Sequence, residues 1–140
     1  MEHKITNEVI ERARKIKLLL MDCDGVLTDG RIYFTENGEQ MKVFNVRDGQ
    51  GIASWNQAGF QSGIISGRDA EKILAARVAE LGMHYLKVRS QDKAKDFLDI
   101  LRSAKVTAAE TAYVGDDVGD ICLLKEVGLP IAVTDADSEV

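Results

Sequence analysis

Two carboxylates stand directly after an apolar run near the beginning of the sequence. Asp22 and Asp24 are separated by one residue, precede Gly25, and follow the mostly apolar run 16–21. This pattern predicts a buried strand that brings both acids to the carboxyl edge of a sheet, where open α/β sheets bind ligands. Because uncompensated charge beside a core is costly, packing alone gives no reason for two acids there, and a cation would compensate them.

A second acidic cluster follows another predicted strand. The residues from Gly115 to Asp120 read Gly-Asp-Asp-Val-Gly-Asp and come after the apolar run 111–114. Carboxylate oxygens suit Mg²⁺, which is commonly held by one or two carboxylates together with a substrate phosphate. Cys23 and Cys122 have no ligand partner at the spacing of a zinc site. The two clusters therefore indicate magnesium-dependent phosphoryl transfer.

The residue types suggest a division of roles. Asp22, at the strand tip, could attack phosphorus and form an aspartyl-phosphate, and Asp24 could exchange the proton with the leaving alcohol and the attacking water. Ser66 and the Gly67 N–H could hold phosphoryl oxygens, with Lys93 as a positive charge on them. Each also has a structural interpretation, because Asp-x-Asp-Gly suits turns, Ser66 could cap a helix and Lys93 could be solvated.

The remaining pattern predicts the elements that position these residues. After a helix over 6–15 and the strand 16–21, strands at 61–65, 83–86, 111–114 and 130–133 alternate with helices. The helices span 48–58 and 118–126, and two more begin near 69 and 92. This rhythm predicts an α/β fold, a Rossmann-like doubly wound and mainly parallel sheet flanked by helices.

A hairpin is expected between the first strand and the first of the later helices. The segments 31–34 and 40–44 flank Asn37-Gly38, a pair typical of the two-residue type I′ turn. One face of the hairpin would then be apolar, and either the domain's own core or another subunit must cover it. The expected pairs are Glu36 with Glu39, Phe34 with Met41, and Ile32 with Val43.

Length and charge limit the possible classes. The 140 residues, 1–140, suit a single domain, and the net charge of −5 without a basic run argues against a nucleic-acid partner. The apolar runs are far shorter than the roughly 20 residues that span a bilayer. The polar start, residues 1–4, lacks the apolar segment of a signal peptide, and we expect no membrane partner. Cys23 and Cys122 form no Cys-x-x-Cys motif, so we expect the reducing cytoplasm as the location.

The four motifs together resemble those of the haloacid dehalogenase superfamily of phosphohydrolases. They are Asp22 to Thr28, Ile65 to Arg68, Lys93, and Gly115 to Asp120, and they occur in the superfamily's order and spacing. The resemblance implies a Mg²⁺ cofactor bound by Asp22, the backbone carbonyl of Asp24 and Asp116. It also implies that Asp117 and Asp120 support those ligands.

A narrower resemblance is to the capless 3-deoxy-D-manno-octulosonate 8-phosphate phosphatases. It rests on Thr28-Asp29-Gly30, on a short hairpin of about 31–44 in place of a cap domain, on Asp48 to Ile52, and on Ser66 to Arg68. It implies hydrolysis of that sugar phosphate on the way to lipopolysaccharide, and a homotetramer in which a neighbour's hairpin helps close each active site. Arg68 would bind the sugar carboxylate. Members of this family continue beyond the point that corresponds to Val140, so the family's C-terminal tail is expected to be missing.

Three other functions remain open from the sequence. Relatives acting on nine-carbon, sialic-type sugar acid 9-phosphates tend to carry Glu at the position of Arg68. A receiver-type signalling domain is also doubly wound, but places its phospho-acceptor after a middle strand that here ends in Ser66. A non-catalytic oligomerisation module would have no need of the Asp22 and Asp24 pair.

Overall fold

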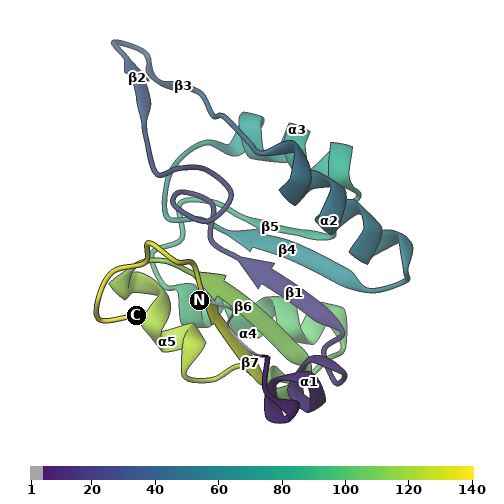
Figure 1. Cartoon of the computed structure of the whole chain (residues 1–140). Coiled ribbons are helices and arrows are strands. Elements are labelled where there is room, and N and C mark those ends of the chain that lie inside the picture. Colours follow the sequence, from purple (N-terminus) through teal and green to yellow (C-terminus); the bar gives the residue numbers. More distant parts are fainter. Residues whose placement is uncertain (1–4) are drawn as a thin grey trace.

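Five parallel strands form the centre of the molecule in the computed structural model, which describes residues 5–140. The predicted polar start at 1–4 lies outside the described residues. The strand order β5-β4-β1-β6-β7 places the first strand in the middle of the sheet (Figure 1). The strands are β1 (Leu18–Met21), β4 (Gln61–Ile65), β5 (Tyr85–Lys87), β6 (Thr111–Gly115) and β7 (Leu129–Ala132). The predicted doubly wound parallel sheet is confirmed.

Alternate residues of β1 enter two separate parts of the core. Leu18 and Leu20 are fully buried in the cluster that contains Phe97 of α4 (Lys93–Ala104) and Leu123 of α5 (Ile121–Leu124). Met21, which points to the opposite face, packs in the cluster of α2 (Val46–Gln57) and α3 (Glu71–Leu81). A strand buried on both faces is the expected result when helices cover a parallel sheet from both sides (Figure 1).

Side-chain caps determine where several helices begin. Thr6 caps α1 (Asn7–Ala13) by accepting from Val9 N–H at 3.3 Å, and Asp92 caps α4. Asn45 caps α2 by accepting from Arg47 N–H at 2.8 Å, so this helix begins before the predicted residue 48. Two short 3₁₀ helices, η1 (Ala108–Glu110) and η2 (Val118–Asp120), precede β6 and α5.

The hairpin forms, but its predicted register is wrong. Strands β2 (Tyr33–Thr35) and β3 (Gly38–Met41) pair Thr35 with Gly38 and Phe34 with Glu39, so the two turn residues are 36 and 37. Gly38 has φ +89°, whereas the φ of Asn37 is not positive, and a type I′ turn needs a positive φ at both central residues. A turn followed by a left-handed glycine is typical of the alternative with a bulge, and the pairing is irregular between Tyr33 and Phe34.

The hairpin projects from the body of the domain (Figure 1). Several of its apolar side chains are exposed. Phe34 is 72% exposed, and Ile32, Met41 and Val43 are about half exposed. Of the two alternatives left open by the sequence, the domain's own core does not cover these side chains among residues 5–140. Within residues 5–140, no helix is long and apolar enough to cross a membrane.

Candidate active site

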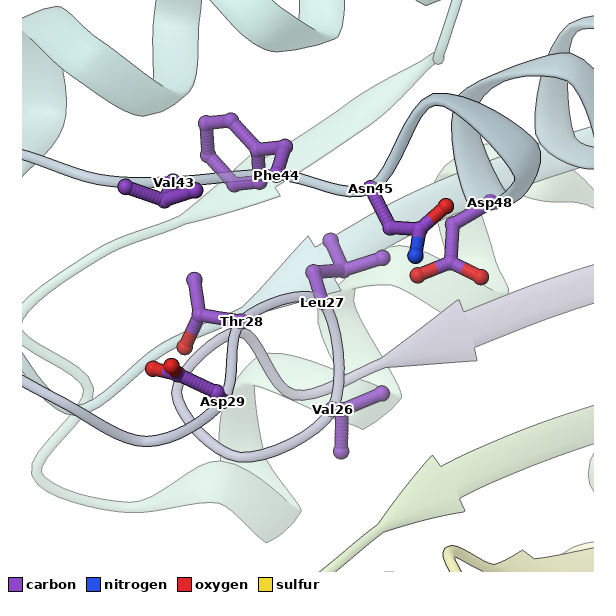
Figure 2. Close-up of a pocket in the computed structure, with 8 residues that line it drawn as sticks. All are labelled: Val26, Leu27, Thr28, Asp29, Val43, Phe44, Asn45 and Asp48. Carbon is purple, nitrogen blue, oxygen red and sulfur yellow. The ribbon is translucent and has the colours of Figure 1, made fainter.

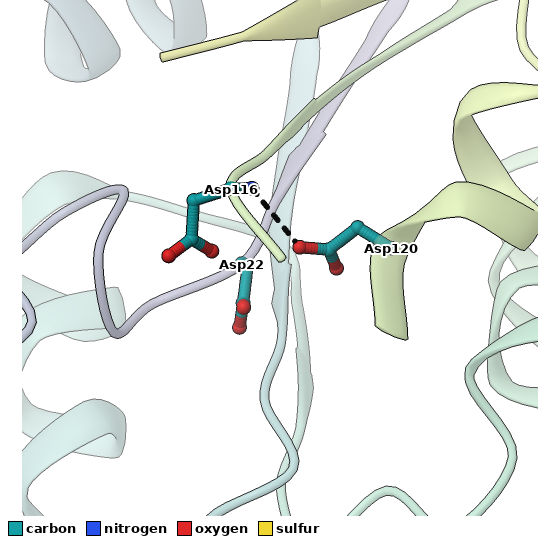
Figure 3. Close-up of side chains that lie close together, drawn as sticks. All are labelled: Asp22, Asp116 and Asp120. Carbon is teal, nitrogen blue, oxygen red and sulfur yellow. Dashed lines mark hydrogen bonds between the residues drawn. The ribbon is translucent and has the colours of Figure 1, made fainter. Parts of the chain in front are cut away.

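Two neighbouring strands bring the acidic clusters together. Strands β1 and β6 pair in register, and the Asp22 N–H donates to the Val114 carbonyl at 3.0 Å. Asp22 and Asp116 therefore leave the carboxyl ends of adjacent strands, and Asp120 approaches from η2 (Figure 3). One carboxylate oxygen of each lies within 4.8 Å of the others. These acids therefore lie together at this edge of the sheet, as the sequence predicted.

Gly25 makes room for one of these acids. Its φ is +89°, and a Cβ added there would lie 1.8 Å from Asp116 Oδ2 and 2.6 Å from Asp116 Cγ. Any side chain would therefore displace the Asp116 carboxylate, in addition to the strain of a left-handed conformation. The glycine of Asp-x-Asp-Gly thus has a steric role in the site as well as a role in the turn.

Asp120 is fully buried and accepts hydrogen bonds on both carboxylate oxygens. Its Oδ1 accepts from Lys93 Nζ at 2.7 Å and from the Tyr113 hydroxyl at 2.7 Å. Its Oδ2 accepts from the backbone N–H groups of Asp116 at 3.1 Å and Asp117 at 3.3 Å. Lys93 Nζ also lies 3.3 Å from Asp22 Oδ2. Asp120 therefore fixes the Lys93 ammonium group beside Asp22 and orders the backbone that carries Asp116.

The acids perturb one another's pKa values. Burial raises the pKa of Asp22 and the negative charge of Asp120 adds to this, although the Lys93 charge opposes both. Burial, followed by the charges of Asp22 and Asp120, raises the pKa of Asp116 to about 6. Burial lowers the pKa of Lys93, but the Asp22 and Asp120 charges outweigh it and the pKa is raised. The single positive charge of Lys93 thus neutralises the negative charges of the three carboxylates only in part.

This charge excess fits a bound cation. Oδ1 of Asp116 is buried and has no hydrogen-bond partner among the described residues, and the Asp116 carboxylate belongs to the cluster with Asp22. A buried oxygen without a partner is costly, and a divalent ion would satisfy it. The available donors are oxygens, the ligand type of hard ions such as Mg²⁺. The carboxylate of Asp120 is already occupied by its four donors.

The strand on the other side of β1 carries the predicted phosphate-binding hydroxyl. Ser66 follows β4, is 1% exposed, and accepts at Oγ from the Arg68 N–H at 3.4 Å. The exposed Gly67 lies between them. Asp117 is also exposed, and its carboxylate accepts from the Val118 N–H at 2.7 Å, which caps η2.

The structure adds two hairpin residues to the site, Lys42 and Glu39, that the sequence interpretation missed. Lys42 Nζ lies 2.6 Å from Asp24 Oδ1 and 2.6 Å from Glu39 Oε1, and Glu39 Oε2 accepts from Arg68 Nε at 3.1 Å. Both residues belong to the hairpin segment. The sequence did not mark them as site residues, because exposed strands commonly carry Lys and Glu. Tyr113 was also missed, although a tyrosine within a buried strand needs a partner for its hydroxyl.

Two cavities flank this region. One, of about 410 Å³, opens beside Lys93 and is also lined by Ser90, Gly119 and Cys122. The other, of about 340 Å³, lies between the loop after Asp24 and the segment that enters α2 (Figure 2). Its lining combines carboxylate, hydroxyl and amide groups with apolar side chains, namely Val26, Leu27, Thr28, Asp29, Val43, Phe44, Asn45 and Asp48. None of the predicted catalytic residues lines the cavity in Figure 2.

Comparisons with known proteins agree with this geometry. No protein-family model matches the chain. The chain is 42% identical over 132 residues to the 3-deoxy-D-manno-octulosonate 8-phosphate phosphatase KdsC of Escherichia coli K12, which covers 94% of this chain and 70% of that protein.

Two solved structures are similar over most of the chain. The phosphatase of the same name from Yersinia pestis has a TM-score of 0.92 and 39% identity, covering 96% of this chain and 72% of its own. The enzyme from Moraxella catarrhalis, in complex with magnesium, phosphate and KDO, has a TM-score of 0.89 and 32% identity, covering 96% of this chain and 76% of its own.

Proposed function

This chain belongs to the 3-deoxy-D-manno-octulosonate 8-phosphate phosphatase family of the haloacid dehalogenase superfamily, and from that membership we propose that it hydrolyses this acidic sugar phosphate. The products are the free sugar acid, a precursor of lipopolysaccharide, and inorganic phosphate. The observation that carries the proposal is the convergence of Asp22, Asp116, Asp120 and Lys93 at one edge of the sheet.

The proposed reaction has two displacements at phosphorus. A carboxylate oxygen of Asp22 bonds to phosphorus while the bond to the sugar oxygen breaks, and Asp24 gives its proton to the leaving alkoxide. Water then attacks the aspartyl-phosphate, Asp24 takes a proton from that water, and the bond to Asp22 breaks to release phosphate. Catalysis of this kind depends mainly on positioning and charge neutralisation.

The surrounding residues supply the charge neutralisation. Lys93 is fixed by Asp120 within 3.3 Å of Asp22, where its ammonium group would pair with a phosphoryl oxygen. Ser66 and the Gly67 N–H would bind other phosphoryl oxygens from the end of the neighbouring strand. Interactions fixed before the substrate arrives cost no reorganisation during the reaction.

A magnesium ion is the proposed cofactor. Asp22, the carbonyl of Asp24, and Asp116 would hold it, while Asp117 and Asp120 support the loop that presents Asp116. When bound, the ion supplies positive charge that lowers the repulsion between an anionic phosphate and the Asp22 carboxylate. The buried, unpartnered Oδ1 of Asp116 supports this assignment.

The substrate and the assembly follow from features outside the acidic cluster. Arg68, which is partly exposed, would pair with the sugar carboxylate and favour the eight-carbon acid over the nine-carbon, sialic-type 9-phosphate. We further propose a cytoplasmic homotetramer in which the exposed apolar hairpin residues, including Phe34, contact a neighbouring subunit near its active site. Sedimentation tests this assembly: Phe34→Glu should shift a tetramer to smaller species, and a monomeric unmodified protein would contradict it.

Phosphate release tests the proposed function. The unmodified chain should release phosphate from 3-deoxy-D-manno-octulosonate 8-phosphate with Mg²⁺ and not with EDTA, and more slowly from the nine-carbon analogue and from glucose 6-phosphate. Asp22→Asn should abolish release without changing the circular dichroism spectrum. Asp99→Asn, on an aspartate of α4 that pairs with the exposed Arg102, is the matched control and should retain release. Undiminished release by Asp22→Asn would rule out the mechanism.

A further inference from the structure

Four alternating charges connect the proposed acid/base to the proposed substrate arginine. Asp24 Oδ1 lies 2.6 Å from Lys42 Nζ, which lies 2.6 Å from Glu39 Oε1. The second oxygen of the same carboxylate, Glu39 Oε2, accepts from Arg68 Nε at 3.1 Å. Two residues of the hairpin segment thus join the loop after β1 to the turn after β4.

Burial separates these two side chains from the rest of the hairpin. The side chain of Lys42 is 1% exposed and that of Glu39 is 2% exposed, whereas Phe34 is 72% exposed. A charge removed from water is tolerated only where it is paired and hydrogen-bonded, and each of these two charges has two partners. The pair is therefore built into the site and is not a solvent-exposed ion pair.

Lys42 restrains a carboxylate that is otherwise free. Across residues 5–140, the Asp24 carboxylate has no hydrogen bond or ion pair other than the contact with Lys42. The ammonium group thus selects the orientation of the group that must reach the leaving oxygen. A misplaced group costs a great deal of rate, because about 1 Å of misplacement can lower it about 100-fold.

Glu39 restrains the arginine in a way that leaves it open to substrate. Glu39 accepts a hydrogen bond only from the Nε of Arg68, and neither terminal nitrogen of that guanidinium makes a hydrogen bond in the described part of the chain. The terminal pair of N–H groups is the part that binds a carboxylate in a bidentate manner. Glu39 therefore orients Arg68 without occupying its recognition edge.

We propose that Lys42 and Glu39 are positioning residues of the proposed phosphatase reaction. Lys42 holds Asp24 in the orientation for proton transfer, and Glu39 holds both Lys42 and the carboxylate-binding Arg68. This inference rests on the proposed function and adds two residues of the hairpin segment to it.

A series of leaving groups tests the role of Lys42. Protonation by Asp24 matters most for an alkoxide and least for p-nitrophenolate, which leaves as a stable anion. Lys42→Met should lower kcat/KM about 100-fold for 3-deoxy-D-manno-octulosonate 8-phosphate, less for phenyl phosphate, and at most about threefold for p-nitrophenyl phosphate. Equal losses on all three esters, or no loss, would overturn the inference, since a purely structural role does not sense the leaving group.

Matched variants separate positioning from folding. Lys42→Met leaves Glu39 buried with one partner fewer, so the double variant Glu39→Gln/Lys42→Met, which removes both charges, is measured beside it. In the double variant the comparison is made between the two aryl esters, because Glu39→Gln also affects binding of the sugar carboxylate. A larger loss for phenyl phosphate than for p-nitrophenyl phosphate supports the inference, and equal losses oppose it. Lys95→Met, on an exposed lysine of α4, is the control and should retain wild-type kcat/KM. If the unmodified chain releases no phosphate from any ester, the proposed function fails and the inference with it.

Substrate charge tests the role of Glu39. Glu39→Gln should lower kcat/KM for the acidic sugar phosphate about tenfold more than for glucose 6-phosphate, whose sugar has no carboxylate, because only the acidic substrate uses Arg68. Glu36→Gln, on an exposed glutamate of the same hairpin, should leave both values unchanged. Equal losses on the two sugars would show that Glu39 does not position Arg68.

Discussion

Replacing Asp120 by Asn should destabilise the fold far more than an ordinary surface change. The carboxylate is fully buried and accepts four hydrogen bonds, two of them from the backbone N–H groups of Asp116 and Asp117. An amide has one acceptor oxygen, so its NH₂ group must face either these N–H groups or the Lys93 ammonium group and the Tyr113 hydroxyl. Removing one partner of a buried pair costs about 3–5 kcal/mol. We therefore expect the free energy of unfolding to fall by about 3–4 kcal/mol, and Tm by about 10 °C.

Urea denaturation at neutral pH with EDTA measures this change without a contribution from metal binding. Tyr113→Phe removes one of the four donors and should cost about 1–2 kcal/mol. Asp99→Asn, which breaks only an exposed pair with Arg102, should cost less than about 0.5 kcal/mol. A loss below about 1 kcal/mol for Asp120→Asn, or an equal loss for Tyr113→Phe, would refute the reasoning.

Two further predictions concern Asp116. Gly25→Ala should lower Mg²⁺ affinity at least about tenfold in calorimetric titration, because the added Cβ would lie 1.8 Å from Asp116 Oδ2. Gly59→Ala introduces a similar backbone strain at φ +92° in open space and should leave the affinity unchanged. The pKa of Asp116 is raised from 3.8 to about 6, so between these values the folded protein binds more protons than the unfolded chain. Without metal, the stability of the wild type relative to Asp116→Asn should therefore fall by about 1–2 kcal/mol as the pH rises through this range, after allowance for solvent screening. Saturating Mg²⁺ should reverse this trend, and a relative stability that rises with pH in EDTA would contradict the assignment.

The sequence predicted the sheet edge well, for a physical reason. Runs such as 16–21 and 111–114 are buried on both sides of a parallel sheet, so their apolar character and their abrupt acidic ends are visible without knowledge of the partners. The carboxyl ends of adjacent parallel strands lie at one edge, and this brings Asp22 and Asp116 together. The starts of two helices are equally local: helices were predicted over 6–15 and from near 92, and α1 and α4 begin at Asn7 and Lys93.

Features that depend on contacts distant in the sequence were not predictable. The position of Lys42 beside Asp24 depends on how the hairpin folds against the loop after β1, and no local pattern distinguishes it from an exposed lysine. The predicted hairpin register was wrong because Asn37-Gly38 is compatible with two kinds of turn. In the turn that forms, Gly38 is left-handed and Asn37 is not. The structure shows where the predicted site residues lie and does not test what they do. The predicted roles stay predictions for all of them, namely Asp22, Asp24, Ser66, Gly67, Arg68, Lys93, Asp116, Asp117 and Asp120.

The central claim is that a carboxylate of this acidic edge becomes covalently phosphorylated. Quenching the protein with acid during turnover of 3-deoxy-D-manno-octulosonate 8-phosphate, followed by borohydride reduction, converts an aspartyl-phosphate into homoserine, which peptide mass spectrometry can locate. We expect homoserine at position 22, and none when EDTA replaces Mg²⁺. Homoserine at position 24, or a protein that turns over substrate without any such product, would contradict the mechanism.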